Sequence, residues 1–252
     1  MSKKCDNIKC KSKNDQANNI NWPEEGRFIK NLSLDGLRDK LVNQRDTTYS
    51  YILTSINLKD NRFYQYGCGP NFQSEYITLG TCKHFMRAGR AHEDWIGVWI
   101  AGFTHSKLQS KKNYLLYLMQ VKKAYLSYSQ VWGEIGEKTR SIKNARINPY
   151  GDIFEPKNEH ASPELETIMK DESYELYHEP IFGHKHNNNK DCKVWKKDIY
   201  KKYINRKNRP SILIGNPEAS FYWDTPTIYY TKRSPRTKKY TNIQNLLGLL
   251  KE

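Results

Sequence analysis

The chain has 252 residues, enough for one large domain or a domain with appendages, and its 42 Lys and Arg residues outnumber 27 Asp and Glu residues to give a formal net charge of +15. Such an excess favours a nucleic-acid partner, with DNA as the first expectation, although charge can also serve solubility alone. No stretch approaches the roughly 20 apolar residues of a membrane span, and Met1 is not followed by an apolar signal-peptide region, so we expect no membrane partner and a cytoplasmic location.

The first half of the chain predicts an α+β arrangement. Residues 1–26 are rich in Lys, Asn and Asp, which predicts a mobile basic arm before a single α+β domain over 27–252. Ser33 is placed as the N-cap of an amphipathic helix. A helix capped by Ser127 follows the strands, an order typical of α+β folds rather than βαβ winding. The predicted strands, the second of them apolar enough to be buried on both faces, are Tyr49–Ser55, Asp94–Phe103 and Asn113–Val121.

The second half of the chain is less regular. Residues 133–194 are polar and broken by prolines, and we interpret them as a long loop-rich insertion with one short helix after Ser162. The elements predicted after it are a basic helix over Trp195–Asn205, a strand over Pro210–Gly215, and a last helix capped by Thr241 and running through Leu250.

Several short motifs stand in a recognisable order. They are Ser50–Leu53, Ile77–Lys83 with Arg87, Asp94–Gly97, Tyr117–Val121 with Tyr128–Trp132, Gly151–Phe154 and Ile214–Trp223. This order resembles the nucleotide modification associated domain family, second type, over residues 48–230. The resemblance implies a small, mixed or antiparallel, partly closed β-sheet core similar to PUA-like domains, with flanking helices. It also implies a role in systems that modify, sense or remove altered DNA bases, including phage defence. Glu93 and His84 depart from the family's pattern.

Asp152 is the first candidate for a catalytic residue. It lies in Asn148–Phe154, where Pro and Gly would fix a turn and present the carboxylate from a loop. Hydrolysis of an N-glycosidic bond needs a carboxylate that orients water or stabilises a cationic sugar, and a donor to the leaving base. Glu155 is the second candidate carboxylate and His105 a candidate donor. The structural alternative is an Asx turn, or an ion pair with Arg146.

Aromatic and basic residues supply candidates for nucleic-acid contacts. A flipped base needs stacking faces and a few hydrogen-bonding groups, whereas the phosphates need cations. Most of the aromatic residues are expected in the core. The positive residues form two basic blocks, over 193–209 and 232–239, and the first can instead be a solvated surface helix. The base-binding candidates are Tyr51, Trp95, Asn148 and Tyr222. The candidates for contact with the nucleic-acid backbone are Lys83, Arg87, Lys197, Lys201, Arg206, Lys232, Arg233 and Arg236.

The cysteines and histidines predict neither a disulfide framework nor a metal site. Five cysteines are an odd number without framework spacing, so we expect reduced thiols, and Cys82 is either activated by nearby positive charge or simply packed. His184 and His186 with Cys192 do not complete a zinc pattern, and we expect no metal and no cofactor. Phosphate-binding glycine loops are absent, which argues against a nucleotide triphosphatase.

The sequence therefore supports two main hypotheses. The first is a DNA glycosylase-type hydrolase that flips out a modified base and cleaves its glycosidic bond. The second is a non-catalytic reader of the same base, and an RNA-binding module is a weaker third possibility. Which base is recognised, whether the DNA is duplex, and the oligomeric state are open.

Overall fold

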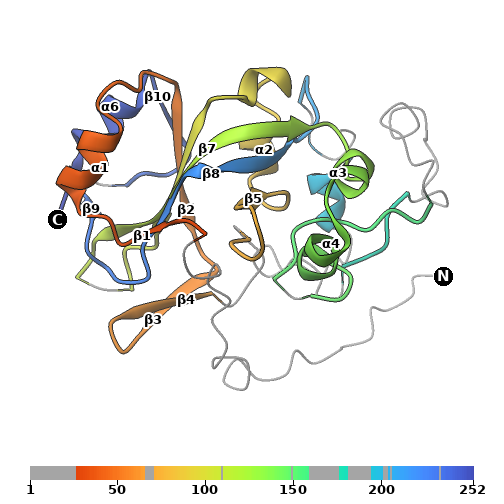
Figure 1. The fold of residues 1–252 in the computed structure, drawn as a ribbon, viewed down its shortest axis with the longest axis horizontal. Coiled ribbons are helices and arrows are strands. Elements are labelled where there is room, and N and C mark those ends of the chain that lie inside the picture. Colours follow the sequence, from red (N-terminus) through yellow and green to blue (C-terminus); the bar gives the residue numbers. More distant parts are fainter. Residues whose placement is uncertain are drawn as a thin grey trace.

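The fold is a mixed α+β arrangement built on one large mixed sheet (Figure 1). The computed structural model describes residues 27–65, 71–108, 110–148, 150–158, 176–180, 194–200, 204, 206–232 and 234–252. The predicted basic arm over 1–26 and much of the predicted insertion over 133–194 lie outside these ranges. Within them, no helix is long and apolar enough to cross a membrane.

The sheet has nine strands, six of which follow one another edge to edge. Their order is β1 (Ile29–Lys30), β8 (Ile212–Tyr222), β7 (Asn113–Tyr125), β6 (Trp99–Thr104), β2 (Thr48–Leu53) and β10 (Lys238–Tyr240). The pairs β1–β8 and β2–β6 are parallel and the others antiparallel. Short strands extend the sheet: β5 (Thr78–Leu79) pairs with β8, and β9 (Tyr229–Tyr230) joins β7 to β11 (Leu250–Lys251). A separate hairpin consists of β3 (Ile56–Lys59) and β4 (Arg62–Gln65).

The central strand β6 is buried on both faces, as its apolar sequence predicted. Alternate side chains of a strand point to opposite faces, so Ile100 enters one hydrophobic cluster while Trp99 and Phe103 enter another. Gly102 is required here because a Cβ would lie 2.1 Å from the ring of Tyr117 on the neighbouring strand. The predicted strands Tyr49–Ser55 and Asn113–Val121 are confirmed as β2 and β7. The strand predicted to begin at Asp94 begins at Trp99, after a short 3-10 helix, η1 (Glu93–Trp95).

Helices cover the second face of the sheet. Leu34 and Leu37 of α1 (Leu34–Lys40) and Ile243 and Leu246 of α6 (Ile243–Leu247) belong to the same cluster as Trp99. Ser33 caps α1 through a hydrogen bond from the backbone of the first turn, as predicted. The last helix is shorter than predicted, and its cap is Asn242 rather than Thr241.

A third cluster joins the β5 end of the sheet to helices from the second half of the chain. It contains Tyr128 of α3 (Tyr128–Glu134), Phe154 and Trp195, packed against Ile212 and Ile214 of β8. The remaining helices within the described ranges are α2 (His84–Arg87), α4 (Glu137–Lys143) and a 3-10 helix, η2 (Val194–Asp198). Parts of the insertion therefore have regular structure.

The predicted basic helix over Trp195–Asn205 is corrected. Only the 3-10 turn η2 forms at its start, and residues 201–203 and 205 lie outside the described part of the chain. Trp195, Ile199 and Ile204 are buried. The burial of these apolar side chains determines the local structure, and the helical spacing of the lysines does not.

Candidate functional site

The turn between β5 and α2 is conformationally unusual. Cys82 and Lys83 follow one another with φ of 62° and 49°, in the left-handed region that non-glycine residues seldom occupy. Each such residue costs on the order of 1–3 kcal/mol and persists only where neighbouring contacts hold it. Here the guanidinium of Arg87 donates from Nε to the carbonyl oxygen of Cys82 at 2.8 Å. The turn is therefore fixed by the helix that follows it.

Asp152 lies directly behind this turn and is completely buried. Its Oδ1 accepts a hydrogen bond from the Thr78 hydroxyl at 2.7 Å, and its Oδ2 accepts one from the backbone N–H of Gly80 at 2.9 Å. Burial raises the pKa of Asp152, whereas the charge of Lys143 and the two hydrogen bonds oppose that rise. The carboxylate thus faces protein groups instead of bulk water.

Lys143, at the end of α4, supplies the opposite charge. Its buried Nζ donates to Oδ1 of Asn71 at 2.8 Å and to the Thr78 hydroxyl at 3.0 Å. Burial lowers the pKa of Lys143 to about 8, and the Asp152 charge opposes that change. The Thr78 hydroxyl therefore accepts from the lysine and donates to the carboxylate, which makes a continuous polar chain across the interior.

A pair of buried tyrosines lies on the sheet side of this centre. The hydroxyl groups of Tyr51 on β2 and Tyr117 on β7 are 2.7 Å apart. Burial raises the pKa of both phenols, so both stay protonated at neutral pH. The hydrogen bond with Tyr117 and the charge of Asp152 further raise the pKa of Tyr51.

Lys83 lies over the outer side of the same tyrosine. Its Nζ is 5.2 Å from the centroid of the Tyr51 ring, and the side chain is partly exposed. Burial lowers the pKa of Lys83, the charge of Cys82 opposes this, and the positive charge of Arg236 adds to the lowering. No hydrogen bond or ion pair joins this Nζ to any residue in the described ranges.

The two basic blocks of the sequence both reach this turn. Arg236 is exposed in the segment before β10, which pairs with β2 and is held there by a hydrogen bond from the Ser50 hydroxyl to the Pro235 carbonyl. On the other side, Phe85 of α2 is 52% exposed, and the guanidinium carbon of Arg206 lies 5.4 Å from its ring centroid. Segments more than 100 residues downstream thus place one cation beside Phe85 and another near Lys83.

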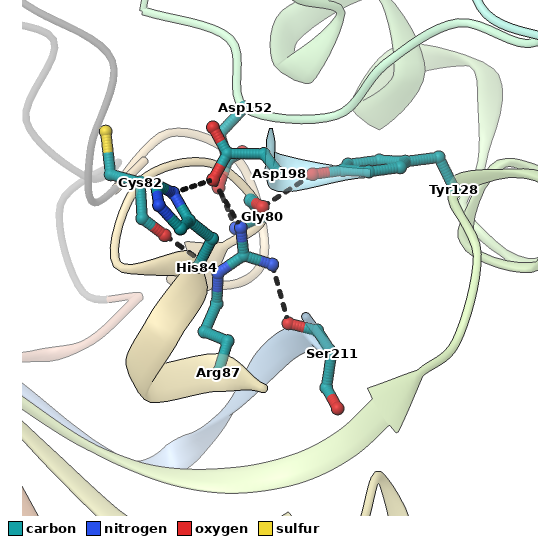
Figure 2. A network of polar contacts seen from close by, with 8 residues as sticks. All are labelled: Gly80, Cys82, His84, Arg87, Tyr128, Asp152, Asp198 and Ser211. Atoms are coloured by element: carbon teal, nitrogen blue, oxygen red, sulfur yellow. Dashed lines mark hydrogen bonds and ion pairs between the residues drawn. The ribbon is translucent and has the colours of Figure 1, made fainter. Parts of the chain in front are cut away.

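Arg87 does not lie on the surface, contrary to its expected role in phosphate contact. Its guanidinium is buried, donating to Oδ1 of Asp198 and to the Ser211 carbonyl, each at 2.8 Å (Figure 2). The ring of His84 approaches the same carboxylate at 3.5 Å. Tyr128 donates to the Gly80 carbonyl at 2.5 Å and so joins α3 to the turn. Arg87 therefore connects α2 to η2 and to the start of β8 through buried hydrogen bonds.

The other two predicted catalytic residues, Glu155 and His105, make hydrogen bonds and ion pairs with residues other than Asp152. Glu155 pairs with Arg146 at 3.1 Å and accepts from Asn144 at 2.9 Å, so the ion pair considered for Asp152 belongs to Glu155. His105 follows β6 in the loop to β7, and its Nδ1 accepts from the backbone N–H of Lys107 at 3.1 Å. Its ring nitrogen thus stabilises a local turn.

The predicted base-binding residues are mostly structural. Trp95 is fully buried, with its Nε1 donating to the Arg87 carbonyl at 3.1 Å, and Tyr222 is buried in β8. Asn148 donates to Gln73 at 3.0 Å and to the Ile142 carbonyl, so its amide holds a turn. Tyr51 alone of the four has its ring beside the Cys82–Lys83 turn.

The remaining residues predicted to contact the nucleic-acid backbone lie in different surroundings. Lys232 is exposed and Lys197 is partly buried in η2. Lys201 and Arg233 lie outside the described residues. Two important residues were missed: Lys143, which was hidden in a polar segment, and Phe85, whose flanking cations in the sequence were a usable signal.

The site contains no recognisable cation-binding cluster in the part of the chain that the structure describes, where no three His, Cys, Asp or Glu side chains are suitably grouped. Comparison with known proteins adds no relative: no family model, no curated protein and no solved structure matches this chain.

Proposed function

We propose that this chain is a DNA-binding protein that holds an unstacked, modified base at the surface formed by Lys83, Phe85, Arg206 and Arg236. The observation that carries the proposal is that both basic blocks reach one short segment. Arg206 lies against the exposed ring of Phe85, and Arg236 acts electrostatically on Lys83. We call these four residues the basic surface.

The chemistry of the basic surface suits a nucleic acid. Cations neutralise phosphates and release counterions, and an exposed aromatic ring offers a stacking face to a base. None of its three cations has an ion pair within the described residues, whereas Lys30 and Lys123 are paired with carboxylates. Arg206 and Arg236 are exposed and Lys83 is partly exposed, so all three can reach phosphates.

Recognition without hydrolysis is the activity that the geometry favours. A carboxylate that orients water must reach the substrate, but Asp152 is buried and both of its oxygens accept hydrogen bonds from the protein. Hydrolysis remains the second candidate because a buried carboxylate with a raised pKa beside a lysine with a lowered pKa is common at catalytic sites.

The family resemblance supports the same surface. Motif segments that carry the resemblance to the nucleotide modification associated domain lie together in the interior next to the Cys82–Lys83 turn: Ser50–Leu53 supplies Tyr51, Ile77–Lys83 forms the turn, Tyr117–Val121 supplies Tyr117, and Gly151–Phe154 supplies Asp152. We infer that the sheet is the PUA-like core of such a domain and that its role is in DNA modification or phage defence.

Binding measurements on Phe85→Ala test the proposal. Fluorescence anisotropy is recorded with single-stranded and duplex oligonucleotides that carry either cytosine or modified cytosines. Loss of one stacked base costs about 1–3 kcal/mol, so we expect affinity to fall by about 5-fold to 150-fold. The matched control is Val42→Ala, which truncates a side chain of similar exposure (56%) just beyond α1 and should change little.

Two further results decide between the candidates. Equal binding by both variants, or no binding by the unaltered protein, would refute the proposed interface. Release of free base from the modified oligonucleotides would favour the hydrolase, and stronger competition by RNA than by DNA would favour an RNA-binding module.

A further inference from the structure

A second group of cations lies next to the basic surface, on the same side of strand β2. Side chains two residues apart on a strand point to the same face, so Tyr49 lies beside Tyr51, whose ring centroid is 5.2 Å from the Nζ of Lys83. In β10, Lys239 is directly opposite Tyr49, and opposite residues of an antiparallel pair share a face. The exposed Lys239 therefore lies on the Lys83 side of the sheet.

Arg90 extends this group of cations. The Tyr49 ring packs against the ring of Trp95 with centroids 5.0 Å apart, and the guanidinium carbon of Arg90 lies 5.7 Å from the Trp95 ring centroid. Arg90 is partly exposed, but its Nη1 is buried and has no hydrogen-bond acceptor among the described residues. A buried charged donor without an acceptor is unfavourable, so an anionic ligand that supplies an acceptor would stabilise this side chain.

We call Arg90 and Lys239 the edge pair. Neither has an ion pair within the ranges that the structure describes, and Glu93, the acidic residue nearest to Arg90 along the chain, contacts His92 at 3.1 Å. The edge pair continues the basic surface, because Arg236 precedes Lys239 by three residues and both side chains are exposed.

The basic surface and the edge pair each combine a cation with an aromatic ring that is at least partly exposed. Phe85 has Arg206 beside it, and Tyr49 has Lys239 opposite it. Sites for single strands combine cations that follow the backbone with rings on which successive bases stack. A duplex keeps its bases paired and stacked, so it can use the cations but neither ring, and one flipped base occupies only one ring.

We propose that the ligand is a single strand of DNA that runs from Phe85 past Lys83 to Tyr49, with its phosphates bound by Lys239 and Arg90. This inference rests on the proposed function and deepens it, because it names the form of the DNA and two further binding residues. The bound strand is several nucleotides long, since the two rings receive different bases and the phosphates between them lie beside Lys83.

Fluorescence anisotropy with the full chain tests the proposal. Labelled single strands of about 2, 8 and 16 nucleotides carry the same modified cytosine, and the longest sequence is also offered as a blunt duplex. We expect the single strand to bind at least about 5-fold more tightly than the duplex, the effect of one more stacked base. Arg90→Gln with Lys239→Gln should lower the salt slope for the two longer strands by about 1.4–2, at about 0.7–1 per lost phosphate contact, and should not change binding of the shortest strand.

The charge-matched control is Lys40→Gln with Lys122→Gln. Both lysines are exposed, Lys40 on α1 at the other face of the sheet and Lys122 on β7, so this variant should keep the salt slope of the unaltered protein. Lys239→Gln alone repeats the test without altering the contact between Arg90 and Trp95, and circular dichroism checks that each variant is folded.

The failure of this inference is distinguishable from failure of the proposed function. Equal salt slopes in the edge-pair variant and its control, or a duplex bound as tightly as the single strand, overturns the inference. The DNA-binding proposal then stands if Phe85→Ala still weakens binding. Absence of binding to every oligonucleotide overturns both.

Discussion

At the scale of single residues, the buried opposite charges of Asp152 and Lys143, connected through the Thr78 hydroxyl, are sensitive to substitution. Asp152→Asn removes one charge and leaves the Lys143 ammonium buried beside a neutral amide. Removing one partner of a buried pair costs about 3–5 kcal/mol, so we expect the free energy of unfolding to fall by that amount. Urea denaturation followed by circular dichroism measures it.

The matched control is Glu155→Gln, three residues along the chain. Glu155 and Arg146 form a partly exposed pair, for which about 0.2–1 kcal/mol is expected. Equal losses in the two variants would show that Asp152 is not held by charge in the interior.

Lys143 should also give the stability a distinct pH dependence. Its pKa is about 8 in the folded protein and 10.5 ordinarily, so between these values the unfolded chain binds more protons than the folded chain. The free energy of unfolding therefore rises with pH in this window, by at most about 1.4 kcal/mol per unit from this group. We expect the unfolding free energy of the unaltered protein minus that of Lys143→Met to rise from pH 7.5 to pH 9.5, and a falling difference would contradict the assignment.

At the scale of elements, the turn after β5 depends on a close approach of two backbones. A Cβ at Gly80 would lie 2.2 Å from the Asp152 carbonyl oxygen, which forces the two segments apart. We expect Gly80→Ala to lower the free energy of unfolding by about 1–3 kcal/mol, as for overpacking, and to weaken DNA binding because the Cys82–Lys83 turn moves.

Gly133→Ala is the control for that prediction. Nothing lies within 4 Å of a Cβ at Gly133 in α3, so alanine should stabilise the helix by about 0.5–1 kcal/mol. Thermal denaturation of both variants measures the difference. If Gly80→Ala were as stable as the unaltered protein, the close approach would not constrain the turn.

Elements that are formed by interactions between residues close in sequence were predicted, whereas those that depend on residues distant in sequence were not. The strand β6 and the cap at Ser33 depend on neighbours in sequence, and both were predicted. The segment from Trp195 was predicted as a helix from its spaced lysines. Its structure instead follows from Trp195 packing on Phe154, 41 residues earlier, with ring centroids 5.3 Å apart. Local periodicity contains no information about such a contact.

At the scale of the whole molecule, the proposed interface depends on cations brought together from distant segments. The double variant Arg206→Gln with Arg236→Gln removes the cation beside Phe85 and the cation that acts on Lys83. Each lost phosphate contact lowers the salt slope of binding by about 1, so we expect a decrease of about 2 in the slope of log K against log salt concentration.

A charge-matched control separates the interface from net charge. Lys59→Gln with Lys251→Gln removes the same charge from exposed positions on β3 and β11. Anisotropy titrations between 50 and 200 mM salt should show a slope close to that of the unaltered protein. The same decrease in both double variants would mean that overall charge, and not the basic surface, determines binding.

The sequence by itself determined the mixed α+β class, the buried central strand and the cationic character of the protein, because these follow from composition and from periodicities shorter than ten residues. Only the tertiary structure decided the fate of the individual site residues. Asp152 is buried by Thr78 and Gly80, which lie 74 and 72 residues away, and Arg87 is held inside by Asp198, 111 residues away. Whether a charged side chain faces water or protein depends on such distant partners, and no local pattern specifies them.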